Sequence, residues 1–260
     1  MPPAPTLNLV TPQPDRAPPS AVPAPSTDAP PCPKHLQFVL SVIAGSTDVI
    51  GFLGLGGLFT AHITGNLVML AAHIAGGTEA QFSEMLSVPV FIVVVTLTTL
   101  LGDGLEAIGL SSLRPLLLLQ FLLLAGFLVL CVAAGAQLDP NSENAVVAGM
   151  VGVSAMAVQN ALVQTSFKGT PSTAVMTSNI THFAIDIGKV LRGGDPADVV
   201  KARSQAARML AVIVGFAAGC SIGAACEVVL GLWSLAVPAG LALLALAIGF
   251  AVNPDGGGGP

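Results

Sequence analysis

Charge is what this sequence has least of. Of its 260 residues, 9 are Lys or Arg and 14 are Asp or Glu, so that charged residues make up 9% of the chain, whereas soluble domains carry about 25%. A soluble protein of this length needs a charged surface, because it cannot bury all of its residues. The scarcity argues against a soluble enzyme, and the net charge of −5 argues against a nucleic-acid partner, which needs a basic surface.

Metal-ligand motifs are also missing. The four cysteines show neither a CxxC pattern nor a cysteine–histidine spacing typical of zinc, and no HExxH motif occurs. We therefore expect no metal and no cofactor, and we interpret the three cysteines in apolar runs as small apolar fillers.

What is present is strongly apolar, since hydrophobic residues make up 53% of the chain and the mean hydropathy is +0.83. A membrane-spanning helix needs about 20 mostly apolar residues. The sequence therefore predicts an all-α integral membrane protein that lies in the lipid bilayer. Six segments are long and apolar enough to span it: 36–58, 85–109, 115–137, 145–167, 207–229 and 232–252.

Two tails flank the predicted membrane domain, which we place at residues 34–252. Residues 1–33 hold 12 of the 20 prolines and are predicted to be disordered, because so proline-rich a stretch cannot bury enough apolar surface to fold. Residues 253–260, with the sequence NPDGGGGP, form a short second tail.

Two further segments are helical in pattern but unsuited to face lipid. Residues 61–75 are too short to cross a bilayer, and residues 172–191 carry too many polar side chains. We expect both to be short or re-entrant helices that lie inside the bundle or line a cavity.

These two segments belong to an internal repeat. The run HITGN at 62–66 aligns with VMTSN at 175–179, at an offset of 113 residues. Each T-x-N segment follows a span with polar residues in its middle and precedes a Gly-Gly pair. We therefore divide the membrane domain into a first repeat, about 36–137, and a second repeat, about 145–252.

The number of spans decides how the repeats are oriented. If the short helices do not cross, the chain has six spans in two inverted three-span repeats; if they cross, it has eight spans in two parallel repeats. With a cytoplasmic N-terminus, six spans place Lys34, Arg114, Lys168 and the basic cluster at 189–208 inside, as the positive-inside rule requires. We therefore prefer six spans, with both termini cytoplasmic, in a bacterial inner (plasma) membrane.

The run AGSTDVIGFLGLGGLFTAHITGNLVMLA, residues 44–71, resembles the signature of the YoaK-like family of multi-span membrane proteins of bacteria and fungi. That signature pairs an A-G-x-x-D-x-x-G-F block, here residues 44–52, with an M-T-G-N-like block, here 63–66. The second half is similar, although Ser178 replaces the glycine usual after Met-Thr. The resemblance implies a multi-span inner-membrane protein from a family of unknown function, and it implies no catalytic or binding residues.

Asp48 is the first candidate for a functional residue. An ionised carboxylate in the middle of a span is unfavourable unless it is partnered or hydrated. We expect Asp48 to bind a cation, a proton or a solute, or to bond to the backbone of the T-x-N helix. In the second repeat its counterparts are the uncharged Gln159 and Asn160.

The T-x-N helices supply four more candidates. Thr64 and Thr177 could donate to a bound anion or to a nearby carbonyl. Asn66 and Asn179 could bind a solute, or they could satisfy exposed groups at a helix end.

A histidine and a carboxylate follow on the second T-x-N helix. His182 and Asp186 are four residues apart and could therefore contact each other on one helix face. Since imidazole titrates near neutral pH, we interpret them as a candidate proton relay.

A stripe of small residues marks a packing face. Gly215, Gly219 and Gly223 recur every four residues, and such a doubled GxxxG motif lets helix backbones approach in lipid. The same face could join two copies of the chain into a homo-oligomer.

Three functions remain open from the sequence. A transporter of a small solute or ion, with its site between the two T-x-N helices, fits the inverted repeat and Asp48 best. A membrane-embedded enzyme that uses His62, His182 and carboxylates with a metal comes second, and a non-catalytic scaffold or assembly subunit comes third. We favour transport over catalysis.

Overall fold

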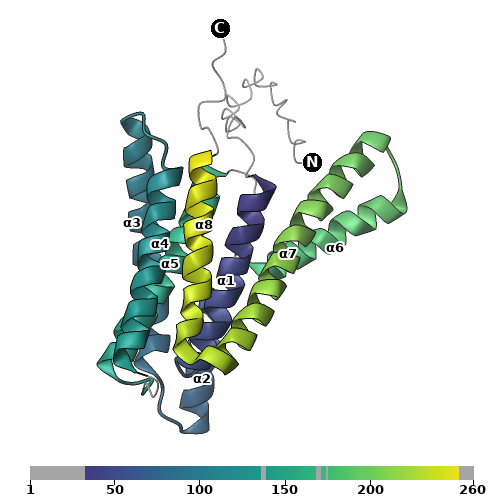
Figure 1. Cartoon of the computed structure of the whole chain (residues 1–260). Coiled ribbons are helices and arrows are strands. Elements are labelled where there is room, and N and C mark those ends of the chain that lie inside the picture. Colours follow the sequence, from purple (N-terminus) through teal and green to yellow (C-terminus); the bar gives the residue numbers. More distant parts are fainter. Residues whose placement is uncertain (1–32, 136–138, 168–170, 174, 252–260) are drawn as a thin grey trace, which may run out of the picture.

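The computed structural model describes residues 33–135, 139–167, 171–173 and 175–251, which form eight α-helices and one 3₁₀-helix (Figure 1). The two predicted tails, apart from Pro33, lie outside the described residues. The elements are α1 (Lys34–Gly54), α2 (Ile63–Gly76), α3 (Phe82–Ala107), α4 (Leu113–Ala134), α5 (Glu143–Ser166), α6 (Met176–Arg192), α7 (Pro196–Leu230), η1 (Gly231–Leu235) and α8 (Ala236–Ala251).

Each of the six apolar segments predicted from the sequence overlaps one helix, namely α1, α3, α4, α5, α7 or α8, and the last segment also takes in η1 before the 16 residues of α8. Within the described residues, five continuous helical segments are long and apolar enough to cross a membrane, and the longest, Pro196–Ala251, contains both α7 and α8. Figure 1 shows these two as separate rods joined by a bend at η1. The chain is therefore an all-α membrane protein, and the count of six spans stays a prediction.

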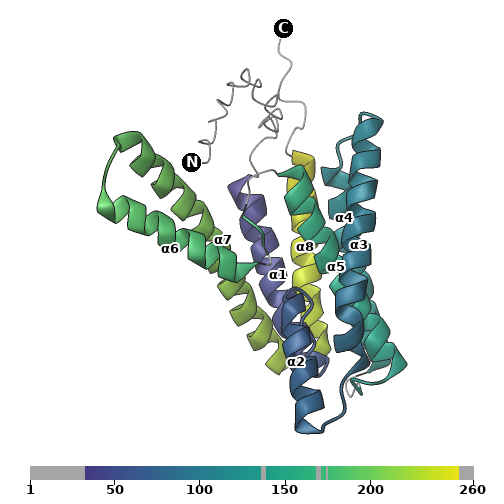
Figure 2. The same ribbon diagram turned by 180° about the vertical axis from the view of Figure 1, so that it is seen from behind.

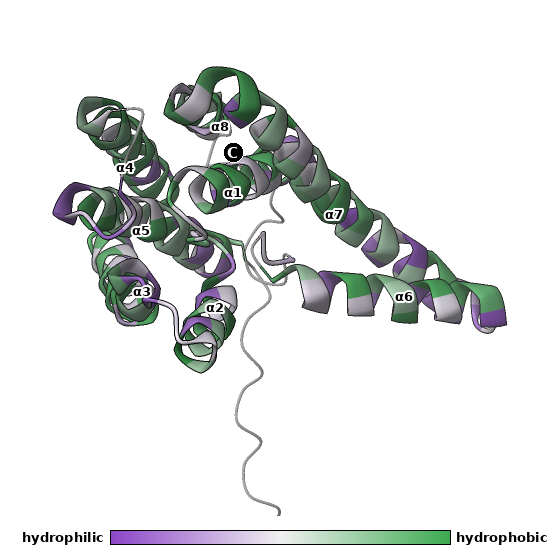
Figure 3. Cartoon of the chain, turned by 90° about the horizontal axis from the view of Figure 1, so that it is seen from below, coloured by the Kyte–Doolittle hydropathy of each residue, from purple (hydrophilic) through white to green (hydrophobic). Residues whose placement is uncertain are grey.

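α3 shows most directly that the outer helices are built for lipid. The residues that α3 buries are polar or glycine: Ser83, Glu84, Ser87, Thr98 and Gly102. Its large aliphatic residues are exposed instead, among them Ile92, Val93, Leu97, Leu100 and Leu101. A water-soluble protein has the opposite distribution, and Figure 3 shows apolar residues along the outer helices.

The packing of the helices follows a two-fold pattern. α1 packs against α7 and α8, while α5 packs against α3 and α4; α2 contacts α3 as α6 contacts α7, and α4 contacts α8. Exchanging each helix with the one four places later in the chain leaves this pattern unchanged. In Figures 1 and 2, α1 runs down from the end nearest the N-terminus and α5 runs up, so the repeats are inverted rather than parallel.

The two short helices begin inside the bundle. α2 follows a non-helical segment that turns back from the end of α1, and the described residues just before α6, at 171–173 and 175, are likewise not helical. α2 runs from about mid-height to the lower end of the bundle, and α6 runs obliquely outward beside α7 (Figures 1 and 2). The second helix begins at Met176 rather than at residue 172, since Ser172, Thr173 and Val175 are not helical.

α1 and α7 approach each other through glycines. A Cβ atom added to Gly219 would overlap the carbonyl oxygen of Val42, and Cβ atoms added to Gly215 and Gly223 would also meet atoms of α1. The predicted packing face is therefore used within the chain. Because α1 occupies this face, a homo-oligomer through the three glycines would need a surface that the chain already uses for its own packing.

Candidate functional site

Asp48 lies on α1 and holds the segment that leads into α2. Its side chain is buried and accepts hydrogen bonds from the backbone N–H groups of Ala61 (2.7 Å) and His62 (3.3 Å). Its second oxygen lies 2.7 Å from Nδ1 of His62. α1 stays helical through this polar stretch, because the hydroxyls of Ser46 and Thr47 bond to carbonyls one turn back. Asp48 is therefore partnered within the bundle instead of facing lipid.

The two asparagines of the T-x-N motifs each hold the backbone seven residues before them. Asn66 accepts from the N–H of Phe59 and donates to its carbonyl, both at 2.8 Å. Asn179 donates to the carbonyl of Ser172 at 2.6 Å. Both asparagines are buried, and neither lines the cavity described below. Of the two roles expected for them, the contacts match the satisfaction of backbone groups.

Gln159 joins helices of both repeats. Its Nε2 donates to the carbonyl of Leu40 on α1 (2.9 Å) and to Oγ1 of Thr173 (2.8 Å), and its Oε1 accepts from Gln120 on α4 (2.6 Å). All of its partners are buried, so the side chain of Gln159 holds helices together and does not face the cavity described below.

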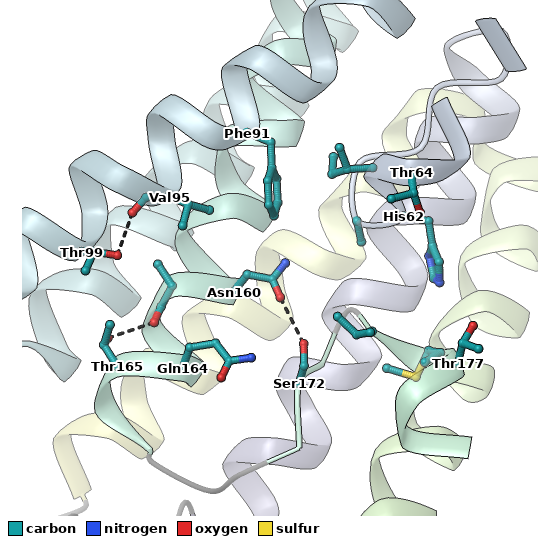
Figure 4. A pocket seen from close by; sticks show the side chains of 15 residues that line it. His62, Thr64, Phe91, Val95, Thr99, Asn160, Gln164, Thr165, Ser172 and Thr177 are labelled. Atoms are coloured by element: carbon teal, nitrogen blue, oxygen red, sulfur yellow. Dashed lines mark hydrogen bonds between the residues drawn. The ribbon is translucent and has the colours of Figure 1, made fainter. Parts of the chain in front are cut away.

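A cavity of about 400 Å³ lies where the two half-helices begin (Figure 4). The first turns of α2 and α6 contribute Thr64 and Thr177. α5 contributes Asn160, whose Oδ1 also accepts a hydrogen bond from Ser172 at 3.3 Å. His62 is the one ionisable side chain among the described residues that line the cavity. The cavity thus brings Thr64, Asn160 and Thr177, three of the predicted residues from the two repeats, to one place.

Part of the lining was not anticipated from the sequence. Phe91, Val95 and Thr99 of α3 line the cavity together with Gln164 and Thr165 of α5. α3 reads as an ordinary apolar span, and only the threonines within its aliphatic run could have drawn attention to it. These residues reach the cavity because α3 packs against α5, and that contact is not visible in the hydropathy.

The predicted contact between His182 and Asp186 is not formed. Asp186 accepts a hydrogen bond from Nζ of Lys189 at 2.8 Å, whereas His182 is exposed. Neither residue lines the cavity. Helix spacing allows both partners, but an ammonium group three residues away pairs more strongly with a carboxylate than a neutral imidazole does.

Two other histidine–carboxylate pairs exist, and both lie in the first repeat. One is His62 with Asp48, and the other is His73 on α2 with Glu84 on α3, whose Nδ1 and Oε2 atoms lie 3.0 Å apart. Glu84 is fully buried. Sequence spacing could not reveal either pair, because the partners come from different elements that only the fold brings together.

The enzyme alternative required His62 and His182 to share a metal. His62 lines the cavity and His182 does not. Within the described ranges, no group of three or more His, Cys, Asp and Glu side chains could hold a metal ion. What the cavity offers chemically is a set of hydrogen-bond donors and acceptors and one group that can exchange a proton.

Comparison with known proteins assigns the chain to a family. Residues 36–248 match the family model described as "Protein of unknown function (DUF1275)". The chain belongs to the DUF1275 family. Because the match runs from α1 to α8, both repeats and all the residues that line the cavity lie within the DUF1275 region.

A curated relative supports the same assignment. The chain is 33% identical over 99 residues to the UPF0700 transmembrane protein YoaK of Bacillus subtilis (strain 168). The matched region covers 38% of this chain and 42% of that relative, and no solved structure matches the chain. The YoaK-like resemblance predicted from residues 44–71 is confirmed, and this DUF1275 protein is a multi-pass membrane protein.

Proposed function

We propose that this DUF1275 protein is a transporter that carries a small polar solute or an ion through the cavity between its two T-x-N half-helices. The observation that carries the proposal is the cavity of about 400 Å³ where α2 and α6 begin. Small-molecule sites commonly have this size, with mostly apolar walls and a few polar groups that fix the orientation of the ligand.

The half-helices add a second argument. Their first turns carry backbone N–H groups that the helix itself cannot pair, at the positive end of the helix dipole. Neither N-cap residue, His62 for α2 or Val175 for α6, supplies a side-chain cap. Secondary transporters built from inverted repeats hold solutes at interrupted helices of this kind, close to the repeat interface. Thr64 and Thr177 place hydroxyl groups beside these helix ends.

The inverted repeats also offer a route to alternating access. The α1–α7 and α3–α5 contacts are equivalent under the two-fold pattern. A transporter of this type opens to the other side when the two repeats exchange their conformations around a fixed central site. The cavity has residues of both repeats in its wall, and so would remain the common site.

We further propose six spans, with both termini in the cytoplasm of a bacterial plasma membrane. α1 begins and α8 ends at the same end of the bundle, and the α6–α7 turn, which follows the basic last turn of α6 with Lys189 and Arg192, points toward that end (Figure 1). Basic connections on one side follow the positive-inside rule. A cysteine placed at Arg114 should react from the cytoplasmic side only, and labelling from outside would contradict the six-span arrangement.

A ligand screen tests the transport proposal. Purified protein is heated with small solutes and ions, because a ligand that binds the folded state raises the melting temperature by mass action. Solutes that raise it are then tested for uptake into proteoliposomes. Thr177→Val and Asn160→Leu should remove the rise, whereas the matched control His182→Ala should keep it. Solutes that stabilise all these variants equally and are not taken up would overturn the proposal.

A further inference from the structure

His62 is the place where the charge of the cavity wall can change. It is the one ionisable side chain among the described lining residues, and its side chain is 35% exposed, while that of Asp48 is 5% exposed. Nδ1 of His62 is held by Asp48, and Nε2 has no hydrogen-bond partner within the described part of the chain. Nε2 can therefore take a proton from water in the cavity.

We propose that the Asp48–His62 pair is a proton-binding site that couples the movement of the solute to the movement of one proton. This inference rests on the proposed transport function and adds the coupling ion to it. On uptake, Nε2 of His62 gains a proton from cavity water, while Nδ1–H stays hydrogen-bonded to Asp48. On release, the same proton returns to water on the other side, and no other bond is made or broken.

Burial makes the proton state of the pair matter. Without the proton, the carboxylate and a neutral imidazole carry one negative charge; with it, the imidazolium balances the carboxylate. A net charge inside a membrane protein is unfavourable, so each state favours a different arrangement of the surrounding groups. Asp48 also binds the N–H groups of Ala61 and His62. The carboxylate that senses the proton therefore also holds the segment that ends at the cavity.

The groups around the pair bring no competing charge. Phe216 of α7 meets the His62 ring edge-on, with 5.1 Å between ring centroids. Cys220, one turn further along α7, is the titratable group there that is close enough to interact with the charge of Asp48. Among the described residues, α2, α3, α5 and α6 present only uncharged side chains to the cavity. Protonation of the cavity wall therefore depends on His62.

The second repeat builds the equivalent place without an ionisable pair. Asn160 accepts from the hydroxyl of Ser172 where Asp48 accepts from the backbone of Ala61. Val175 stands at the position of His62 in the aligned motif. One half of the site can titrate and the other cannot, so that each transport cycle would carry a single proton through this pair.

The accessibility of one cysteine tests this coupling without a known solute. The four native cysteines are replaced by alanine, and Thr177→Cys in the full chain, in proteoliposomes, is labelled with a maleimide from about pH 5.5 to about pH 8.5. Each rate is divided by the fraction of thiolate at that pH, measured in the folded variant by the ultraviolet absorbance of the thiolate, which removes the ionisation of the thiol itself. We expect this ratio to change about tenfold or more across the range, and to be independent of pH in His62→Gln.

Two further variants sharpen the outcome. Asp48→Asn keeps the shape of the side chain and should move the midpoint of the pH profile to lower pH, because a neighbouring carboxylate favours the imidazolium. His73→Gln removes the other histidine–carboxylate pair, with Glu84, and should leave the profile unchanged. Melting temperatures of all variants show whether each one folds.

A labelling profile that is independent of pH in the Thr177→Cys protein with His62 intact, or a pH dependence that remains after His62→Gln, would overturn the coupling. If a solute still stabilises the native protein but not Thr177→Val, the proposed transport site stands and only its coupling to a proton is lost. If no solute stabilises the native protein or enters proteoliposomes, the transport proposal fails as well.

Discussion

The segments that lead into the two half-helices are held in the same way but by different chemical groups. In each repeat an asparagine, Asn66 or Asn179, binds the backbone seven residues before it. A polar residue of the preceding long helix binds the same segment, and this residue is the charged Asp48 in the first repeat and the neutral Asn160 in the second. A neutral polar side chain is therefore sufficient to hold the segment at this position. The additional charge of Asp48 acts on His62, which lies beside it.

The half-helices themselves also differ. α2 has 14 residues and contacts α3, whereas α6 has 17 residues, lies beside the longer α7 and ends in Lys189 and Arg192. Basic residues at a helix C-terminus stabilise the helix dipole, and they also suit the cytoplasmic surface of a membrane. The two repeats thus share the structure around the cavity and differ at the ends that point away from it.

The largest difference in stability between the two repeats should appear when the polar residue that holds each segment is removed. Asp48→Ala deletes the acceptor of two backbone N–H groups and the partner of His62, so we expect the free energy of unfolding to fall by about 2–4 kcal/mol. Asn160→Ala removes two long hydrogen bonds of a half-buried side chain, to Met156 and Ser172, and should lower it by about 1 kcal/mol. Denaturation of the purified protein in mixed micelles, followed by circular dichroism, measures both. Equal losses would show that the charge adds nothing to the hold on this segment.

The two asparagines test what the repeats share. Asn66→Ala leaves a backbone N–H and a carbonyl without partners in a buried site, and we expect a loss of about 2–3 kcal/mol. Asn179→Ala should cause a loss of similar size. The two losses should add in the double variant, because they arise in separate repeats. A loss in one repeat only would contradict the equivalence of the two segments.

Two glycines differ in how closely other helices approach them. A Cβ atom at Gly223 of α7 would lie 2.6 Å from Val49 of α1, whereas one at Gly102 of α3 would lie 3.8 Å from its nearest neighbour, Ser112 at the start of α4. Gly223→Ala should therefore lower the stability by about 1–3 kcal/mol. Gly102→Ala should change it little or raise it by up to about 1 kcal/mol, because alanine favours the helix. The same denaturation assay decides, and equal effects would show that the two contacts are equally tight.

His182→Ala should have the smallest effect. The side chain is exposed and has no partner among the described residues, so neither the melting temperature nor solute binding should change measurably. His62→Ala, in contrast, should alter both. A clear loss in His182→Ala would place this histidine in a contact that the fold does not contain.

The sequence could predict the membrane-spanning helices, because each of them is a continuous run of about 20 mostly apolar residues. It could also predict the repeat, because the T-x-N motifs recur at a fixed offset. For Asp48, the backbone of the T-x-N helix was one of the expected partners, but the side chain of His62 was not, since His62 reaches Asp48 only after the chain turns back from the end of α1. The His182–Asp186 prediction failed for a related reason: helix spacing brings two side chains within reach, but competition with Lys189 decides which contact forms.

The sequence by itself determined that the chain lies in a membrane, which segments are helical and that its two halves are related. These properties depend on composition and on local periodicity, and both can be read along the chain. Only the tertiary structure decided which polar residues meet at the cavity and which are used in packing. The rotation of each helix about its axis and the path of the segments that lead into the two half-helices set that division, and both depend on contacts between residues far apart in the sequence.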